Sequence, residues 1–455
     1  MIWSTERYVG YGKMRLAYDE PSQPHSSTDL ATMGTFSAAD PAPQPHTASE
    51  LFVGRQPILD RAQRLHAYEL LFRTSGGNHA AVTNDLQATA TVITNAFSEL
   101  AIGRVLGPHR GFINLDRRLL LSDVIEILPK GQVVLELLET IEPDHEVVAR
   151  CRDLRQKGYT LALDDIVQLG PAYEELLPFI DIVKVDLHGI ERRNLSALAR
   201  QIRRLGKTAL AEKVDSHEQM EYCRDLGFDL FQGYFFAKPE VIKGRKLDHA
   251  QMVLMNLMTL IEQDADSDRL VDSFKLQPGL SLNLLRLTNS AACGLGVRVT
   301  SLRHAITVLG RRQLMRWLQL LLFVGEAPPA ENPLLQLAAS RGRLMELLTF
   351  EIDHKAGVLG EHAFMTGILS LTPALLGQPI EEIVAGLPIG AEVEAALLKQ
   401  AGLLGALLAL VQKIELEAGV VDAAALAKLR LSTDSLNSSI ARAIAWANEL
   451  GYERG

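Results

Sequence analysis

The feature that most constrains the fold is a series of short apolar runs, each of which carries a polar residue near its end. The runs are GFINL, VVLEL, LALDD, IDIVKVD, ALAEKVD and FQGYFF. Their polar residues follow one another at intervals of 22, 28, 20, 28 and 20 positions, and they are Asn114, Glu136, Asp164, Lys184, Glu212 and Gln232. Each interval is about the length of one strand and its crossover helix, so the series predicts alternating strands and helices in a largely parallel sheet.

We expect these strands to form a (β/α)₈ barrel, because in that fold the carboxyl ends of all the strands meet on one face. Carboxylates, an amide and a lysine at successive strand ends are hard to explain as core residues, since charged side chains are rarely buried without partners. The sequence therefore predicts that chemistry is assembled at this face of the barrel.

Composition divides the chain into three parts. Residues 1–50 are rich in Ser, Pro, Ala, Thr and His without periodicity, and they predict a disordered tail. The strand-like runs stop before the polar stretch KGRKLD, so we expect the α/β domain to cover residues 51–245. Residues 246–455 follow a helical period throughout, in stretches such as QMVLMNLMTLIEQ and RRQLMRWLQLLLF, and predict an all-α domain.

Charge and composition exclude several classes of function. The net charge of the 455 residues is -9 and no long basic block offsets it, so nucleic acid is not an expected partner. The longest apolar run, residues 401–411, is too short to cross a bilayer, and no signal peptide pattern opens the chain, so we expect a cytoplasmic protein without a membrane span. Three scattered cysteines indicate neither a disulfide framework nor a metal knuckle.

The carboxylates expected at the barrel face pose a charge problem. Five of them would meet beside the amide of Asn114, and they are Glu69, Glu136, Asp164, Asp165 and Glu212. Like charges at such close range cannot all remain ionised without compensation. Carboxylate and amide oxygens without His or Cys favour Mg²⁺ or Mn²⁺ over zinc. A pair of such ions clamps the attacking and leaving oxygens of a phosphodiester displacement, which is the chemistry that we expect here.

On these residues the first domain resembles the EAL family of cyclic di-GMP phosphodiesterases, over most of residues 52–239. The glutamate that begins the motif after which the family is named matches Glu69 in YELLFR, although Leu70 and Leu71 replace the Ala-Leu that follows. The family's upstream QPI segment is present and begins at Gln56.

The resemblance implies an EAL-type TIM-like barrel that hydrolyses cyclic di-GMP to linear pGpG with Mg²⁺ or Mn²⁺. The implied metal ligands are Glu69, Asn114, Glu136, Asp164, Asp165 and Glu212. The implied substrate-binding residues are Gln56, Arg73, Asp186 and Gln232, with Arg73 on a phosphate of the dinucleotide. Lys184 is similar to the lysine that orients or activates the attacking water, and the implied catalytic residues are Lys184, Glu69 and Asp165.

Two segments depart from the family pattern. The acidic pair is followed by IVQLGP, residues 166–171, where the family has a Phe-Gly-Thr-Gly-type loop that supports the second metal and the dimer interface. The family's Glu-Gly-Val-Glu stretch reads EKVD, which shortens one carboxylate at Asp215 and adds a cation, Lys213, near the metals. A lost carboxylate contact commonly costs about 10 to 100-fold in metal affinity or activity. An active enzyme, a weak or inactive receptor or adaptor for cyclic di-GMP, and a scaffold without ligand therefore remain open.

The second domain resembles the HDOD domain, a relative of the HD phosphohydrolases, over most of residues 250–440. The segments that carry the resemblance are LLRLTNSAACG, SLRHAITVLGRRQLMRWL and AFMTGILSLTPALLG. Ser370 and Leu371 occupy the place of the metal-binding His-Asp pair, so we expect no hydrolase chemistry from this half. Its histidines are not spaced as a metal cluster, and they are His249, His304, His354 and His362. By analogy the domain binds a protein partner, or forms a homodimer, and biases the barrel.

Overall fold

The structure is a computed structural model. It describes residues 51–74, 102–238, 249–325, 328–385, 387, 389–416 and 423–451. All of them fall in one compact unit, Ser49–Gly455. The expected tail over residues 1–50 and the expected domain boundary after residue 245 lie outside the described residues.

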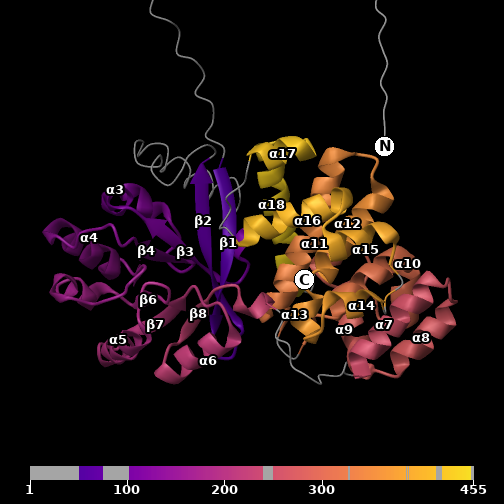
Figure 1. The fold of residues 1–455 in the computed structure, drawn as a ribbon, viewed down its shortest axis with the longest axis horizontal. Coiled ribbons are helices and arrows are strands. Elements are labelled where there is room, and N and C mark those ends of the chain that lie inside the picture. Colours follow the sequence, from indigo (N-terminus) through magenta and orange to yellow (C-terminus); the bar gives the residue numbers. More distant parts are fainter. Residues whose placement is uncertain are drawn as a thin grey trace, which may run out of the picture. The chain divides into compact units, whose positions relative to one another are not determined.

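The first half of the chain contains an eight-stranded closed barrel whose strands follow one another in chain order (Figure 1). The strands are β1 (Leu51–Asp60), β2 (Leu65–Thr74), β3 (Arg110–Leu115), β4 (Val133–Leu137), β5 (Thr160–Leu163), β6 (Ile182–Asp186), β7 (Thr208–Glu212) and β8 (Leu230–Gln232). Strand β1 runs antiparallel to both of its neighbours, β2 and β8, and all the other pairs are parallel. The predicted barrel and its largely parallel sheet are confirmed.

One apolar residue from each strand fills the inside of the barrel. These eight residues form a separate buried cluster, which we call the plug, and they are Ile58, Ala67, Phe112, Val134, Ala162, Ile182, Leu210 and Leu230. Strands of this kind are buried on both faces, which is why a run such as VVLEL is almost continuously apolar. The plug closes the barrel, so a site has to lie above it, at one mouth.

Helices cover the outside of the barrel and join the strands. The connecting α-helices are α2 (Ile102–Leu106), α3 (Arg117–Leu121), α4 (His145–Gln156), α5 (Arg192–Arg204) and α6 (His217–Leu226). Between β5 and β6 the chain forms only the short 3₁₀ helices η3 (Pro171–Tyr173) and η4 (Leu177–Phe179) instead of the expected crossover α-helix. Pro171 opens η3, where a proline is tolerated, whereas Pro178 lacks the N–H that would continue a helix from the preceding turn.

The second half is helical throughout its described residues, as predicted. Its α-helices are α7 (His249–Glu262), α8 (Ser267–Lys275), α9 (Pro278–Thr288), α10 (Leu302–Leu321), α11 (Pro333–Ile352), α12 (Gly357–Leu369), α13 (Thr372–Leu376), α14 (Ile380–Ala385), α15 (Ala391–Lys399), α16 (Gly402–Leu416), α17 (Ala423–Leu429) and α18 (Thr433–Asn448). Helix α10 breaks at Gly310, which adopts φ +67°. Helices α11 and α12 pack so closely that a Cβ on Gly367 would lie 2.7 Å from the Cα of Gly342.

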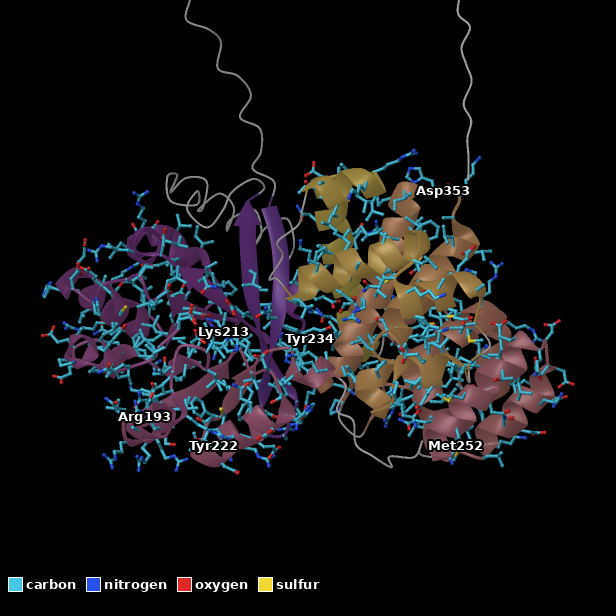
Figure 2. The ribbon with its side chains drawn as sticks, viewed as in Figure 1. Arg193, Lys213, Tyr222, Tyr234, Met252 and Asp353 are labelled. Atoms are coloured by element: carbon cyan, nitrogen blue, oxygen red, sulfur yellow. The ribbon has the colours of Figure 1, made fainter. Side chains whose placement is uncertain are left out.

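The side chains of both halves are drawn in Figure 2, where Lys213 and Tyr234 belong to the barrel and Met252 and Asp353 to the helices. Over the described residues, no single helix combines the length and the apolar character that a membrane span needs, and only the bent pair α15 and α16 meets both criteria together.

Candidate metal centre at the mouth of the barrel

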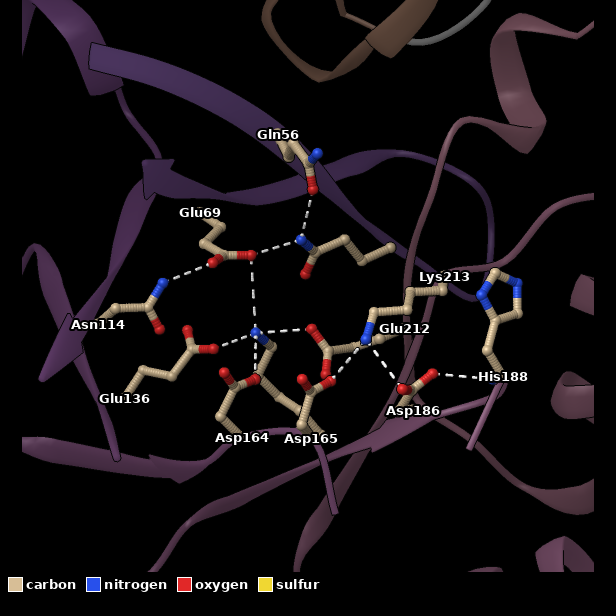
Figure 3. A network of polar contacts seen from close by, with 12 residues as sticks. Gln56, Glu69, Asn114, Glu136, Asp164, Asp165, Asp186, His188, Glu212 and Lys213 are labelled. Carbon is tan, nitrogen blue, oxygen red and sulfur yellow. Dashed lines mark hydrogen bonds and ion pairs between the residues drawn. The ribbon is translucent and has the colours of Figure 1, made fainter. Parts of the chain in front are cut away.

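A layer of polar side chains lies directly above the plug. In each strand from β2 to β8 the polar residue comes two positions after the plug residue, and in the reversed strand β1 it comes two positions before. Side chains two residues apart on a strand point to the same face, so the whole layer points into the barrel mouth. Its members are Gln56, Glu69, Asn114, Glu136, Asp164, Lys184, Glu212 and Gln232 (Figure 3).

The ammonium of Lys184 lies at the centre of this layer. Its Nζ is 3.0 Å from Asp164 Oδ1, 2.7 Å from Glu212 Oε1 and 3.6 Å from Glu69 Oε2. It also contacts Glu136 Oε1. The lysine is 1% exposed, so water does not screen these contacts. One positive charge therefore faces four carboxylates.

Two amides hold the carboxylate of Glu69 in place. Asn114 Nδ2 donates to Glu69 Oε1 over 2.7 Å, and Gln232 Nε2 donates to Glu69 Oε2 over 2.5 Å. The same Gln232 amide donates to Gln56 Oε1 over 3.0 Å. Because both amides donate through nitrogen, their oxygens face the mouth as acceptors.

Four buried oxygens of the layer have no hydrogen-bond partner: Asn114 Oδ1, Glu136 Oε2, Glu212 Oε2 and Gln232 Oε1. A buried polar atom without a partner is costly, and in most proteins it is satisfied by protein, water or an ion. All four atoms are acceptors, so the partner that would satisfy them is a cation or a donor. Glu69, Glu136 and Glu212 each offer one oxygen within 4.8 Å of the others, and such an all-oxygen set suits a hard divalent cation.

The pKa shifts describe the same imbalance of charge. Burial raises the pKa of the Glu136 carboxyl well above its ordinary value and raises the pKa of Glu212 to about 8. Burial opposes the charge of Lys184 as well, but the surrounding carboxylates, first that of Glu136, outweigh it and hold the lysine pKa well above its ordinary range. Lys184 therefore stays protonated, and in the absence of a further cation Glu136 and Glu212 tend to hold protons as well.

A second group of acidic residues lies beside the layer, at the ends of β4 and β5. Glu139, Asp164 and Asp165 each offer one oxygen within 4.8 Å of the others. Asp165 is also contacted by Lys213, whose Nζ lies 3.0 Å from Asp165 Oδ1 and 2.8 Å from Asp186 Oδ2. The carboxylate of Asp186 accepts a further hydrogen bond from the backbone N–H of His188 over 2.8 Å.

The structure brings together most of the residues that the sequence singles out. The layer contains Gln56, Glu69, Asn114, Glu136, Asp164, Lys184, Glu212 and Gln232, and Lys213 joins Asp165 and Asp186 beside it. Arg73 lies on β2 opposite Phe52, and its side chain lies outside the described residues. The sequence analysis missed Glu139, although it stands three positions after Glu136 in the same ELLE segment. The roles assigned to these residues remain predictions.

Apolar residues anchor the loop that departs from the family pattern. Ile166 is buried and donates its backbone N–H to the carbonyl of Lys184 over 2.9 Å. Leu169 is also buried, whereas Val167 is exposed. The loop is thus held by side-chain packing where the family's pattern has glycines.

In the helical half, an arginine contacts the place of the missing His-Asp pair. Ser370 Oγ accepts a hydrogen bond from Arg341 Nη1 over 2.7 Å and donates to the carbonyl of Gly367 over 2.7 Å. Leu371 is buried in the core. Within the part of the chain that the structure describes, both groups of side chains that could hold a metal belong to the barrel.

Comparisons with known proteins match both halves of the chain. The EAL domain family matches residues 44–239 and the HDOD domain family matches residues 248–370. Cyclic di-GMP phosphodiesterase CdgJ of Vibrio cholerae is 33% identical over 370 residues, which are 80% of this chain and 84% of that protein. Uncharacterized protein YuxH of Bacillus subtilis is 32% identical over 356 residues, 76% of this chain and 86% of that protein. Among solved structures, the calcium and cyclic di-GMP complex of BlrP1 from Klebsiella pneumoniae is 25% identical, covering 44% of this chain and 58% of that chain with a TM-score of 0.36.

Proposed function

The chain belongs to the family of proteins in which an EAL domain is followed by an HDOD domain, and we propose that its barrel hydrolyses cyclic di-GMP with the help of a divalent cation. The observation that carries the proposal is the polar layer above the plug, which leaves four buried oxygens without a partner around one lysine. An arrangement with that much uncompensated charge is typical of a catalytic or binding site.

The residues that would hold the cation are Glu69, Glu136 and Glu212, with oxygens of Asn114 and Asp164 beside them. A bound divalent cation would balance the carboxylates and polarise a phosphodiester oxygen. Whether the ion is Mg²⁺ or Mn²⁺ depends on affinity and supply, because both prefer oxygen ligands.

Lys184 acts as a hydrogen-bond donor in this proposal. Its pKa is raised by the carboxylates around it, so the side chain holds its proton and does not remove one from water. It can orient the attacking water or a phosphate oxygen through its N–H groups and stabilise negative charge that develops on phosphate. Glu69, held by Asn114 and Gln232, and Asp165, at the end of β5, complete the proposed catalytic set.

The proposed reaction opens one of the two phosphodiester bonds of the cyclic dinucleotide. The oxygen of water bonds to phosphorus, the bond from phosphorus to the ribose 3′ oxygen breaks, and a proton passes to that oxygen. The product is linear pGpG. Gln56, Arg73, Asp186 and Gln232 are the proposed substrate contacts, and Gln232 Oε1 is buried without a partner and can accept a hydrogen bond from the substrate.

For the helical half we propose interaction with a protein, either a partner or a second copy of this chain. In support, several large apolar side chains are exposed in the segment from α7 to the loop before α10: Met252, Leu276, Leu282 and Val297. Replacing Leu276 and Leu282 by Ser is expected to weaken association, which light scattering of the full chain would measure as a lower mass. An unchanged mass and unchanged barrel turnover would argue against this surface.

The test of the barrel function is an assay of the full chain with cyclic di-GMP and Mn²⁺ or Mg²⁺, in which binding and linear product are measured together. Product is the expected result, and chelation of the metal should abolish it. Glu69→Gln keeps the size of the side chain and should reduce turnover by about 10 to 100-fold. The matched control is Glu191→Gln, an exposed carboxylate that pairs with Arg193 on the surface.

A second candidate function is a receptor that binds cyclic di-GMP without turnover. It is favoured by the contact of Lys213 with Asp165, which places a cation on one of the expected metal ligands. Binding without product in the same assay would support the receptor, and neither binding nor product would contradict both functions.

A further inference from the structure

Lys213 has an unusual backbone conformation at the edge of the site. It follows Glu212 directly at the end of β7, and its φ is +57°. Asp165, at the end of β5, has φ +46°. A non-glycine residue in this region is uncommon, and its surroundings have to offset the cost of the conformation. The side chains of these two residues are joined by the ion pair of 3.0 Å (Figure 3).

The ammonium of Lys213 satisfies the carboxylates that surround it. It bridges Asp165 and Asp186, which come from different strands of the barrel, and both distances are those of ordinary charged hydrogen bonds. Asp165 belongs to the acidic group formed with Asp164 and Glu139, so one ligand of that group already has a cation. A lysine offers a compact positive charge that can take the place of an ion.

The group formed by Glu69, Glu136 and Glu212 differs, because it shares the single ammonium of Lys184 with Asp164 and still leaves buried oxygens without partners. The ion pairs of Lys213 go to Asp165 and Asp186. The unpartnered buried oxygens of the polar layer belong to Glu136, Glu212 and the two amides beside them. A further cation would therefore find unpartnered oxygens at this first group. In the group around Asp165, Lys213 already supplies a positive charge.

We propose that Lys213 takes the place of a second divalent cation, so that the mouth of this barrel binds one ion, at the group of Glu69, Glu136 and Glu212. The inference rests on the proposed function, because it takes from it the position of the first ion. A glycine at position 213 would accept the same backbone conformation without strain and would leave Asp165 and Asp186 to a metal.

The test is the number of Mn²⁺ ions bound by the full chain at saturation, measured by equilibrium dialysis with elemental analysis. The wild type is expected to bind one ion per chain and Lys213→Gly two. The second ion should also appear as a spin-coupled pair in the electron paramagnetic resonance spectrum, a signal that does not depend on turnover. Lys213→Met keeps the length but not the charge, and it should also bind two ions if the charge excludes the second ion.

The matched control is Arg430→Gly. Arg430 is an exposed cation of the helical half with φ +57°, so the change removes the same charge and the same positive φ of a non-glycine residue, in the half that does not contain the acidic groups. It is expected to leave one ion per chain. A thermal unfolding midpoint for each variant confirms that it is folded.

Four outcomes overturn the proposal. Two ions in the wild type overturn it alone and leave the proposed hydrolysis intact. One ion in Lys213→Gly shows that the lysine does not exclude the second ion. Two ions in the glycine variant but one in Lys213→Met assign the effect to bulk and not to charge. If neither the wild type nor any variant binds Mn²⁺, the metal centre of the proposed function is contradicted as well.

Discussion

The barrel mouth and the core of the helical half both bury charged side chains, but they balance them differently. At the mouth, one buried ammonium, that of Lys184, faces four carboxylates. In the described residues of the helical half, the buried carboxylate of Glu346 and the half-buried one of Glu415 each have a guanidinium. Arg316 donates to both oxygens of Glu346 over 2.9 Å, and Arg341 likewise donates to both oxygens of Glu415.

The unpartnered carboxylate oxygens follow this difference. At the mouth, Glu136 and Glu212 each leave one buried oxygen without a hydrogen bond. Among the described residues of the helical half, no buried carboxylate oxygen is left in this state. Both regions contain deeply buried charge, so burial alone does not distinguish a site from a structural ion pair. The distinguishing feature is charge that the protein does not itself compensate.

The largest expected effect comes from removing the central lysine. Lys184→Met should lower turnover by about 10² to 10⁴-fold, the range for loss of a positioned proton or hydrogen-bond donor at a reacting group. Without metal the variant should also be less stable by about 3–5 kcal/mol, because four carboxylates lose their only buried cation. Mn²⁺ should restore much of that loss, since a divalent ion replaces the missing charge. Urea unfolding with and without Mn²⁺ measures both changes in stability. An equal loss of stability in both conditions would show that a metal does not replace the lysine charge at the mouth.

The corresponding change in the helical half should not respond to metal. Arg341 is 1% exposed, and Arg341→Met leaves the half-buried Glu415 without its cation. We expect a loss of about 3–5 kcal/mol with or without Mn²⁺. Replacing both partners, Arg341→Met with Glu415→Leu, should recover most of the stability, because no charge is then left alone. If the double variant does not recover stability, Arg341 contributes more than its charge, for example through its hydrogen bond to the hydroxyl of Tyr234.

The polar layer could be predicted from the sequence because two simple periods determine it. The period of two along a strand places Phe112 with Asn114, and Leu210 with Glu212, on one face, and the interval of 20 to 28 residues returns the chain to the same mouth. These periods need no knowledge of long-range contacts. The helical half was predictable for a similar reason, since its apolar residues recur with the helical period.

Other parts depend on contacts that a sequence pattern does not contain. The hairpin of β1 and β2 lacks the usual signals, because Pro57 lies within β1 and the turn contains Gln63 at φ +59° in place of glycine. The contact between Lys213 and Asp165 depends on a left-handed backbone at both residues. The pairing of Arg341 with Glu415 joins positions 74 residues apart, which no local period predicts.

The two regions should also differ in the sign of their dependence on pH. Burial raises the pKa of Glu212 to about 8, above the unfolded value of about 4.3, so in metal-free protein the folded barrel holds a proton that the unfolded chain releases. Barrel stability should then fall as the pH rises between these values, by at most about 1.4 kcal/mol per pH unit for one proton. In contrast, Arg316 and Arg343 overcome the effect of burial and hold the pKa of Glu346 below its ordinary value. The contribution of Glu346 to stability is present above the pKa that this residue has in the unfolded chain, and it is lost as the pH falls through its lower pKa in the folded protein.

Each half carries its own probe for this measurement. Cys151 and Cys223 are buried in the barrel, and burial raises the pKa of both thiols to about 12, so their alkylation requires local opening. Trp317 and Trp446 belong to the helical half and report its unfolding by fluorescence. Alkylation rates are compared with those of the unfolded chain at the same pH. Parallel slopes from the two probes would show that Glu212 does not hold an extra proton in the folded barrel. If it does, Mn²⁺ should abolish the barrel slope, because a bound cation keeps the carboxylate ionised.

The smallest expected effect concerns ion pairs that are exposed in either half. Arg193 Nε lies 2.6 Å from Glu191 Oε2 in the barrel, and Lys275 Nζ lies 2.9 Å from Asp272 Oδ1 in the helices. Their distances match those of the buried pairs, yet water solvates each partner when the other is removed. Arg193→Met and Lys275→Met should therefore leave the unfolding midpoint and its response to Mn²⁺ unchanged. A measurable shift of the unfolding midpoint in either variant would mean that the distance within an ion pair determines its contribution to stability. Burial and uncompensated charge would then not distinguish the barrel mouth from other ion pairs.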